Sequence, residues 1–166
     1  MTNEEFYLED LKTKFSKINP KEYYLSYSGG RDSHFLYWFI KEYAHIEGIK
    51  IIGINTYMEH QEILARIKKN CDKVLLPILK PFEIKEKYGI PLYDLTDELL
   101  KEIEKKYNIE VPEVYNYVSR TGCMGCPYGS YKHDTEKELK LITGKQKDFI
   151  LKIFGESYKV LGIKEE

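Results

Sequence analysis

The chain has 166 residues, 32% of them charged, and a formal net charge of -1 at pH 7. This length suits one domain with a buried core, and the net charge gives no overall field that would attract nucleic acid or an anionic membrane. Three cysteines do not suit the disulfide framework of a secreted protein. The acidic, polar start is unlike a signal peptide, and no apolar run approaches the ~20 residues of a membrane span. We therefore expect a cytoplasmic protein with no membrane partner.

The hydrophobic pattern alternates between helical and extended segments along most of the chain. Helices are predicted at residues 4–18, 33–46, 61–69, 82–88, 94–106, 136–143 and 145–154, and strands at 23–27, 49–54 and 73–78. A strand–helix–strand unit implies parallel strands joined by a right-handed crossover. The sequence therefore predicts an α/β fold with an open, mostly parallel sheet and helices on both faces.

A glycine pair lies between the first predicted strand and the helix that follows it, in the stretch Ser28–Ser33. In an open parallel sheet, ligands bind beyond the carboxyl ends of the strands. Glycine lets the backbone approach an anion, and a helix start offers unpaired N–H groups and a positive dipole end. The residues expected to hold phosphates are Ser28, Gly29, Gly30, Arg31, Asp32 and Ser33. Asp32 is also a candidate Mg²⁺ ligand. The alternative is a plain turn in which Asp32 or Ser33 caps the helix and nothing binds.

This loop resembles the SGGxDS signature of the PP-loop ATP pyrophosphatase superfamily. Within that superfamily, the chain from about Tyr23 onward is similar to the phosphoadenosine-phosphosulfate (PAPS) reductase family, near the branch of the DNA-phosphorothioation sulfurtransferases. Three more segments carry the resemblance. Residues 55–62 (NTYMEHQE) resemble the family's NTG…PE stretch, residues 87–91 (KYGIP) its KYGxP turn, and residues 120–129 (RTGCMGCPYG) its Cys-x-x-Cys tail.

The resemblance implies an adenine-nucleotide α-hydrolase-like, Rossmann-like fold. It implies one domain over residues 1–166, with a cysteine-containing C-terminal segment at 119–166. Nucleotide contacts are implied for Asn55, Thr56 and Glu62, although Tyr57 and Gln61 depart from the family pattern. Because residues 54–57 follow the neighbouring strand, we expect their backbone to contact the base.

Cys123 and Cys126 stand two residues apart and can direct both sulfurs at one ligand or at each other. We favour a thiol pair in which one sulfur attacks and the other resolves the intermediate, with Arg120, Lys132 and His133 lowering a thiol pKa. A zinc or iron–sulfur site is an alternative. Such a site would need ligands from distant parts of the chain or from a second chain, since only Cys71 and four histidines remain. Cys71 itself is expected to be a small buried hydrophobe. A buried structural pair is the third interpretation.

The resemblance implies two enzymatic functions that differ in the nucleotide. A reductase would take PAPS or adenylyl sulfate and release sulfite, with electrons from a thiol-donor protein, but the single-cysteine ECG motif typical of such reductases is missing. An ATP pyrophosphatase acting as an adenylating sulfurtransferase would take ATP and Mg²⁺, a sulfur-donor protein, and a nucleic acid or small molecule as acceptor. No RNA-binding appendage is recognisable. A non-catalytic nucleotide sensor is a third hypothesis, and a homodimer is compatible with all three.

Overall fold

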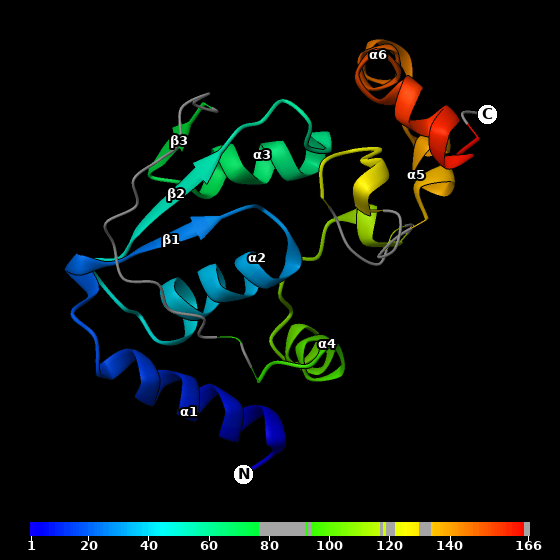
Figure 1. The fold of residues 1–166 in the computed structure, drawn as a ribbon. Helices are drawn as coiled ribbons and strands as arrows, with labels where there is room; N and C mark the ends of the chain where they lie inside the picture. The colour runs from blue at the N-terminus through cyan, green and yellow to red at the C-terminus, as the bar shows by residue number, and fades with distance from the viewer. Residues whose placement is uncertain (77–91, 93, 117, 119–121, 130–133, 165–166) are drawn as a thin grey trace. The chain divides into compact units, whose positions relative to one another are not determined.

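The computed structural model describes residues 1–76, 92, 94–116, 118, 122–129 and 134–164. These residues form two compact units (Figure 1). Unit 1 contains Met1–Ile54 and Arg66–Val111, and unit 2 contains Asn55–Ala65 and Pro112–Glu166. The predicted helix at 82–88 and the KYGxP-like turn lie outside the described residues. The single-domain assignment stays a prediction.

Unit 1 is built on a three-stranded parallel sheet in the order β1-β2-β3. Its strands are β1 (Tyr24–Tyr27), β2 (Lys50–Ile54) and β3 (Lys73–Leu75). The helices are α1 (Asn3–Ser16), α2 (Arg31–Trp38) and α4 (Asp97–Lys106), while α3 (Gln61–Asn70) begins in unit 2 and ends in unit 1. With α5 (Thr135–Leu141) and α6 (Gly144–Leu161) of unit 2, the described residues contain six α-helices. The predicted α/β class with a parallel sheet is confirmed.

The side chains of β1 and β2 alternate between a buried and an exposed face of the sheet. Leu25, Tyr27 and Ile51 are buried, whereas Tyr24 and Ile54 are exposed. This period of two is the pattern of a sheet with one face against a core. Tyr27 pairs with Gly53 in the parallel register, so β1 and β2 end at the same edge of the sheet.

Gly53 allows α3 to lie close against β2. A Cβ at this position would stand 2.7 Å from Cys71 Sγ and 2.7 Å from Ile67 Cγ2, closer than real side-chain contacts. Cys71 is partly buried, and this burial raises the pKa of its thiol to about 11. Cys71 therefore packs as the small hydrophobe that its place between a helix and a strand predicts, although it is not fully buried.

The helix after the loop differs from its prediction in two ways. It begins at Arg31 instead of residue 33, with Gly30 as its N-cap, so neither Asp32 nor Ser33 caps it. It then passes into a π-helical segment, Phe39–Tyr43. Phe39 and Ile40 in this segment are 0% and 1% exposed, so the change in winding lies at the core, and a hydrophobic pattern does not reveal it.

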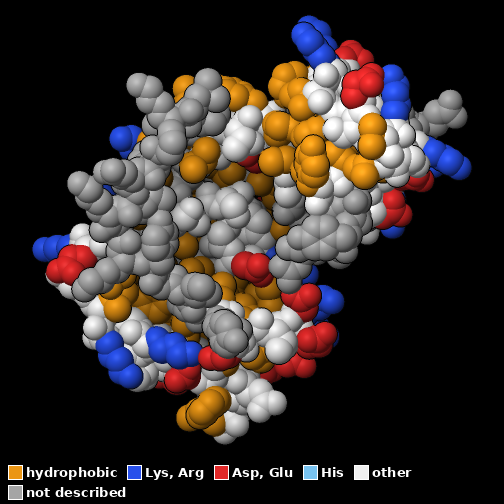
Figure 2. Space-filling view, in the orientation of Figure 1, with side chains coloured by type: hydrophobic (Ala, Val, Ile, Leu, Met, Phe, Trp, Pro, Cys, Tyr) orange, Lys and Arg blue, Asp and Glu red, His pale blue; other side chains and the backbone are white. Residues whose placement is uncertain are grey.

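Unit 2 packs two helices over its own core. α5 (Thr135–Leu141) and α6 (Gly144–Leu161) follow the short 3-10 turns Glu113–Asn116 and Pro127–Gly129. The core consists of five buried side chains: Met124, Leu139, Ile142, Ile150 and Tyr158. α6 also carries hydrophobic side chains at the surface (Figure 2), including Phe149 and Ile153, each 44% exposed.

No helix in the described part of the chain is both long and apolar enough to cross a membrane.

Candidate functional site

Hydrogen bonds of two serines close the loop after β1. Ser28 Oγ lies 3.0 Å from Ser33 Oγ and accepts a long hydrogen bond, 3.4 Å, from the Gly30 N–H. Ser33 Oγ also donates to the Gly30 carbonyl at 3.1 Å. Gly29 has φ +76°, a left-handed conformation that favours glycine. The motif therefore forms a tight turn from the end of β1 into the first turn of α2.

The start of α2 lacks a capping side chain, because its N-cap is Gly30. The first N–H groups of a helix have no partner within the helix, and they carry its positive dipole end. Ser28 and Asp32 beside this end are exposed. The loop can therefore offer backbone N–H groups to an anion from solvent.

The guanidinium of Arg31 forms an ion pair with α4 and does not serve the predicted phosphate loop. Its Nε donates to Glu104 Oε1 of α4 at 3.0 Å, and its Nη2 forms a very short contact with Glu104 Oε2. Glu104 is only 8% exposed, so this two-pronged pair joins α2 to α4 in a partly buried setting. Arg31 can still contribute its backbone N–H to the loop.

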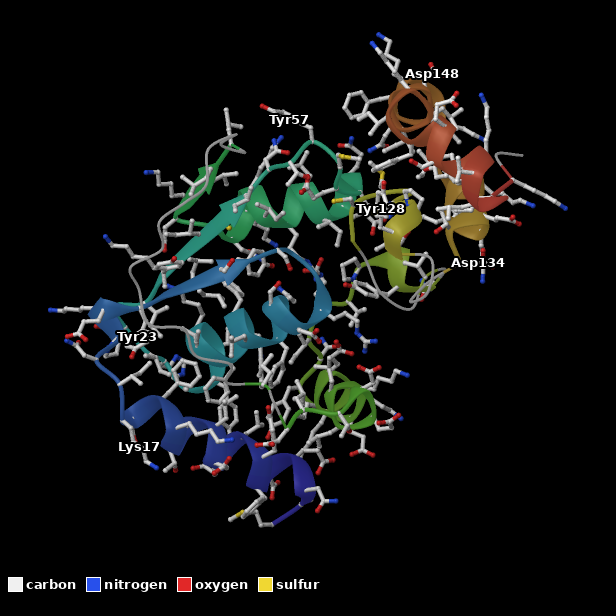
Figure 3. All side chains as sticks on the ribbon, in the orientation of Figure 1. Lys17, Tyr23, Tyr57, Tyr128, Asp134 and Asp148 are labelled. Carbon is white, nitrogen blue, oxygen red and sulfur yellow. The ribbon has the colours of Figure 1, made fainter. Side chains whose placement is uncertain are left out.

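The turn after β2 belongs to unit 2, and part of its hydrogen bonding is local. Asn55 Oδ1 accepts from the Tyr57 N–H at 2.9 Å. Tyr57 has φ +67° and is 58% exposed at the outside of the turn (Figure 3). This left-handed backbone is one that glycine adopts without strain, although a tyrosine stands here.

Glu62, the third residue predicted in this stretch, is exposed and accepts a hydrogen bond from the Val114 N–H at 3.2 Å. Its carboxylate therefore holds the segment 112–116 within unit 2.

The two cysteines flank a turn anchored in the unit 2 core. The Cys126 N–H donates to the Cys123 carbonyl at 3.1 Å. Between them, Met124 is 1% exposed and Gly125 has φ +61°. Cys123 is exposed and Cys126 partly buried, whereas Met124 between them packs into the core.

A buried carboxylate fixes this cysteine turn. Glu138 of α5 is 1% exposed, and its Oε2 accepts from the Gly125 N–H at 3.1 Å. Its Oε1 lies 2.7 Å from His60 Nε2. The Tyr158 hydroxyl donates to the Gly125 carbonyl. Both polar backbone atoms of Gly125 are therefore held by buried side chains.

The cysteine turn and the turn after β2 meet within unit 2. The Met124 N–H donates to the Met58 carbonyl at 2.7 Å. The side chains of Thr56 and Glu59 both act on the pKa of the Cys123 thiol. The structure thus brings the segment that contains Thr56 together with the cysteine turn, two segments predicted for separate roles. The loop Ser28–Ser33 lies in unit 1.

The pKa of Cys123 is raised. Partial burial of the thiol is the main cause, and the charges of Cys126 and Glu59 add to it, while the hydrogen bond from Thr56 acts in the opposite direction. The three basic residues expected to lower the pKa (Arg120, Lys132 and His133) lie outside the described residues. In these surroundings Cys123 rests as a thiol at neutral pH.

Sequence reasoning missed Glu59, His60 and Glu138. A signal existed for Glu59, because Thr56 and Glu59 have the T-x-x-E spacing in which the two side chains reach each other's backbone. Half of that pattern forms, since the Thr56 N–H lies 3.1 and 3.2 Å from the two carboxylate oxygens of Glu59. Glu138 gave no such signal, because its contacts join residues far apart in sequence.

Among the described residues, no three His, Cys, Asp or Glu side chains gather as a metal-binding group. The zinc and iron–sulfur interpretation of the cysteine pair therefore gains no additional ligand from this part of the chain.

Comparison of the chain with protein-family models, with curated proteins and with solved structures finds no match.

Unit 1 also has a pocket of about 240 Å³, and His34, Tyr37 and Asn70 are among its lining residues. The rings of His34 and Tyr37 stack with centroids 5.7 Å apart. The Tyr27 hydroxyl lies 2.8 Å from His34 Nδ1 and accepts from Asn70 Nδ2 at 2.9 Å. Burial and the charge of Arg66 lower the pKa of His34 to about 4.

We expect this histidine to make unit 1 less stable in acid. Because the unfolded chain binds the proton near pH 6.5 and the folded chain only near 4, stability is lost as the pH falls between these values. The loss amounts to about 3 kcal/mol at most. Urea unfolding followed by the fluorescence of Trp38, the single tryptophan, measures it in unit 1.

The control is His34→Asn, whose Oδ1 can take the place of Nδ1 beside Tyr27 without titrating. The variant should lose less stability than the wild type between pH 7 and 4. Parallel pH curves for the two proteins would show that His34 is not the group responsible.

Proposed function

We propose that this chain binds an adenine nucleotide by its phosphates at Ser28–Ser33 and uses Cys123 and Cys126 as a reactive thiol pair. In this proposal it is a PAPS-reductase-like enzyme that acts on PAPS or adenylyl sulfate. The observation that carries the proposal is the loop: a left-handed Gly29 after β1, and a helix start at Gly30 with no capping side chain. This arrangement suits a bound phosphate.

The side chains around the loop fit a nucleotide with Mg²⁺. The hydroxyls of Ser28 and Ser33 lie at the turn, and the carboxylate of Asp32 is exposed in the first turn of α2. Carboxylate oxygen is a ligand that Mg²⁺ prefers, usually together with phosphate oxygens. Asp32 would hold the ion, while backbone N–H groups would bind the phosphates.

The exposure of the two cysteines suggests their order of action. Cys123 is exposed and would attack the sulfonyl sulfur of the nucleotide, so that an S–S bond forms, the S–O bond to phosphate breaks and the nucleoside phosphate leaves. The thiolate of Cys126, partly buried, would then attack Cys123 Sγ. Sulfite leaves, the two cysteines form a disulfide, and a thiol-donor protein reduces that disulfide.

A second candidate is an adenylating sulfurtransferase that uses ATP and Mg²⁺. It is favoured by the two thiols in one turn, since the reductase tail typically carries a single catalytic cysteine. Cys123 would carry the sulfur as a persulfide, whose outer sulfur would attack the adenylated acceptor so that AMP leaves. Cys126 would then attack Cys123 Sγ, which breaks the bond to the transferred sulfur and leaves a Cys123–Cys126 disulfide for a thiol-donor protein to reduce. The acceptor would be a nucleic acid or a small molecule, and the sulfur would come from a donor protein.

Both candidates include the wider features that the resemblance implies. These are a Rossmann-like, adenine-nucleotide α-hydrolase-like fold with helices on both faces of the sheet, a cytoplasmic location and contacts from Asn55, Thr56 and Glu62 to the nucleotide. A homodimer is compatible with both. A non-catalytic nucleotide sensor would share the binding loop without turnover.

Thermal unfolding in the presence of ATP, PAPS or adenylyl sulfate, each with Mg²⁺, tests the proposed binding. A ligand that binds only the folded chain, present at a hundred times its dissociation constant, adds about 2.7 kcal/mol of stability. Sulfite release then indicates the reductase, and pyrophosphate release from ATP indicates the sulfurtransferase. Binding without either product supports the sensor, and no stabilisation by any of the three nucleotides would contradict the proposal.

Asp32→Ala should weaken binding of the Mg²⁺–nucleotide on the order of tenfold, because one oxygen ligand is lost. Asp97→Ala is a matched control, since Asp97 is also an exposed aspartate in the first turn of a unit 1 helix. Titration calorimetry with and without Mg²⁺ measures the difference. Equal losses in the two variants would remove Asp32 from the site.

A further inference from the structure

The two cysteines lie at the ends of a closed backbone turn. The Cys126 N–H donates to the Cys123 carbonyl at 3.1 Å, which is the hydrogen bond of a β-turn. Gly125, the third residue, has φ +61°, whereas Met124, the second, has a negative φ, and this combination is that of a type II turn. A β-turn brings its first and last Cα atoms within about 7 Å, and a disulfide spans Cα atoms about 4.4–6.8 Å apart. The backbone of the turn therefore suits a disulfide between its ends.

A buried carboxylate holds the central peptide group of this turn. Type I and type II turns differ by a rotation of the peptide group between their second and third residues. Here that group carries the Gly125 N–H, which donates to Glu138 Oε2 at 3.1 Å. Glu138 is 1% exposed, so the hydrogen bond is shielded from solvent. The contact therefore opposes the rotation that would change the type of the turn.

The next peptide group of the turn is held as well. The hydroxyl of Tyr158, which is 0% exposed, donates to the Gly125 carbonyl. The carboxylate of Glu138 is itself fixed at its other oxygen, because Oε1 lies 2.7 Å from His60 Nε2. Side chains of α5 and α6 thus hold both polar backbone atoms of Gly125, and His60 supports the first of them.

We propose that Glu138 and Tyr158 are positioning residues that preorganise the cysteine turn for disulfide formation. Without their hydrogen bonds, the reduced turn could adopt more backbone conformations, and closing the disulfide would have to restrict them again. Because both side chains fix the turn before the sulfurs join, they favour the disulfide over the two thiols. That this disulfide forms in a catalytic cycle rests on the proposed function.

Exchange with glutathione measures this preference without any nucleotide. One thiolate of the pair attacks oxidised glutathione, a mixed disulfide forms, and one glutathione leaves as a thiolate. The second cysteine thiolate then attacks the cysteine sulfur of the mixed disulfide, and the second glutathione leaves. The pair loses two electrons, oxidised glutathione gains them, and the protons of the two thiols pass to solvent or to glutathione. In a Cys71→Ser background only Cys123 and Cys126 can react, and mass spectrometry gives the equilibrium constant.

Glu138→Ala should lower this equilibrium constant on the order of tenfold, the factor expected when the backbone of one residue is no longer fixed. Glu138→Gln should stay within about threefold of the wild type, since its amide oxygen can accept from Gly125 and its amide N–H can donate to unprotonated His60. A wild-type constant in folded Glu138→Ala would overturn the proposal, because a merely structural role lowers stability and leaves the constant unchanged. A tenfold loss in Glu138→Gln would also overturn it, since charge would then set the equilibrium.

Tyr158→Phe keeps the buried ring and tests the proposal even if Glu138→Ala fails to fold. Loss of the hydroxyl should lower the constant about three- to tenfold, and hydrogen exchange of α5 and α6 checks that unit 2 remains folded. Glu136→Ala is the matched control, since Glu136 is another α5 glutamate but accepts from the Lys164 N–H, at 3.0 Å. An unchanged constant in folded Tyr158→Phe, or an equal loss in Glu136→Ala, would contradict the assignment.

The positioning role and the proposed function can fail separately. A constant that depends on Glu138 and Tyr158, in a protein that binds no nucleotide, would support the positioning role and contradict the function. Nucleotide-dependent turnover, with a constant that neither side chain affects, would do the reverse.

Discussion

Cys123→Ser and Cys126→Ser should each abolish turnover while the nucleotide affinity stays within about twofold. A hydroxyl is a far poorer nucleophile than a thiol or thiolate at neutral pH, and serine differs from cysteine by one atom. The predicted phosphate loop contains neither residue. Titration calorimetry and a product assay on the same preparations measure binding and turnover separately.

The two variants should fail at different steps of the proposed reductase reaction. Cys126→Ser keeps the exposed attacking thiol, so one equivalent of an S-sulfonated Cys123 should accumulate, and mass spectrometry would detect it. Cys123→Ser should show no adduct. The reverse distribution would assign the attack to Cys126.

Cys71→Ser is the control for loss of a thiol as such. Cys71 lies in unit 1 beside Gly53, whereas the cysteine turn belongs to unit 2. Its replacement should therefore leave turnover unchanged. Serine variants of the pair that retain full turnover would remove both cysteines from the mechanism. Variants that lose their fold, in a wild type with stoichiometric zinc or iron, would move the pair to the metal interpretation.

The sequence predicted the sheet and the loop because both depend on local patterns. Short runs rich in β-branched and aromatic residues predicted β1 and β2 to within one residue at each end. The start of α4 was placed three residues early at 94, whereas the helix begins at Asp97, where Thr96 caps it by accepting from the Leu99 N–H. The cap was readable from the sequence, since threonine is a favoured N-cap residue.

The length of α6 shows where prediction from local sequence patterns fails. The predicted end was residue 154, but the helix continues to Leu161. Gly155 and Ser157 lower helix propensity there, which favours an earlier end. Tyr158, one turn further, is 0% exposed in the unit 2 core, and its burial stabilises the additional turns.

The candidate site could be predicted residue by residue but not as an arrangement. Thr56 and Cys123 were each identified from a motif, yet nothing in their spacing indicates that their segments meet. They are separated by 66 residues, and the Met124–Met58 backbone hydrogen bond that joins the segments depends on how unit 2 folds. The direction of the Cys123 pKa shift was likewise not predictable, since it is set mainly by burial.

Gly125→Ala should unfold or strongly loosen unit 2, with a loss of about 2–5 kcal/mol from backbone strain and overpacking together. The position has φ +61°, where a Cβ is strained. The added carbon would stand 2.7 Å from Tyr158 Oη and 2.8 Å from Ile150 Cγ2. These are core side chains with little room to move, and overpacking of a core costs roughly 1–3 kcal/mol beyond the strain.

Two other glycine positions distinguish the cost of backbone strain from the cost of steric overlap. Gly144 has the same φ of +61° but no neighbour within 4 Å among the described residues, so Gly144→Ala should lose only about 1 kcal/mol. Gly122 precedes Cys123 and has neither a positive φ nor a described neighbour within 4 Å, so Gly122→Ala should have almost no effect on stability. The order of losses should be Gly125, then Gly144, then Gly122.

Peptide-resolved hydrogen exchange measures these losses in unit 2, because the fluorescence of Trp38 reports on unit 1. In Gly125→Ala, the amides of α5 and of α6 around Ile150 should lose protection. If Gly125→Ala were as stable as Gly144→Ala, the buried contacts of Gly125 would not be what positions the two thiols.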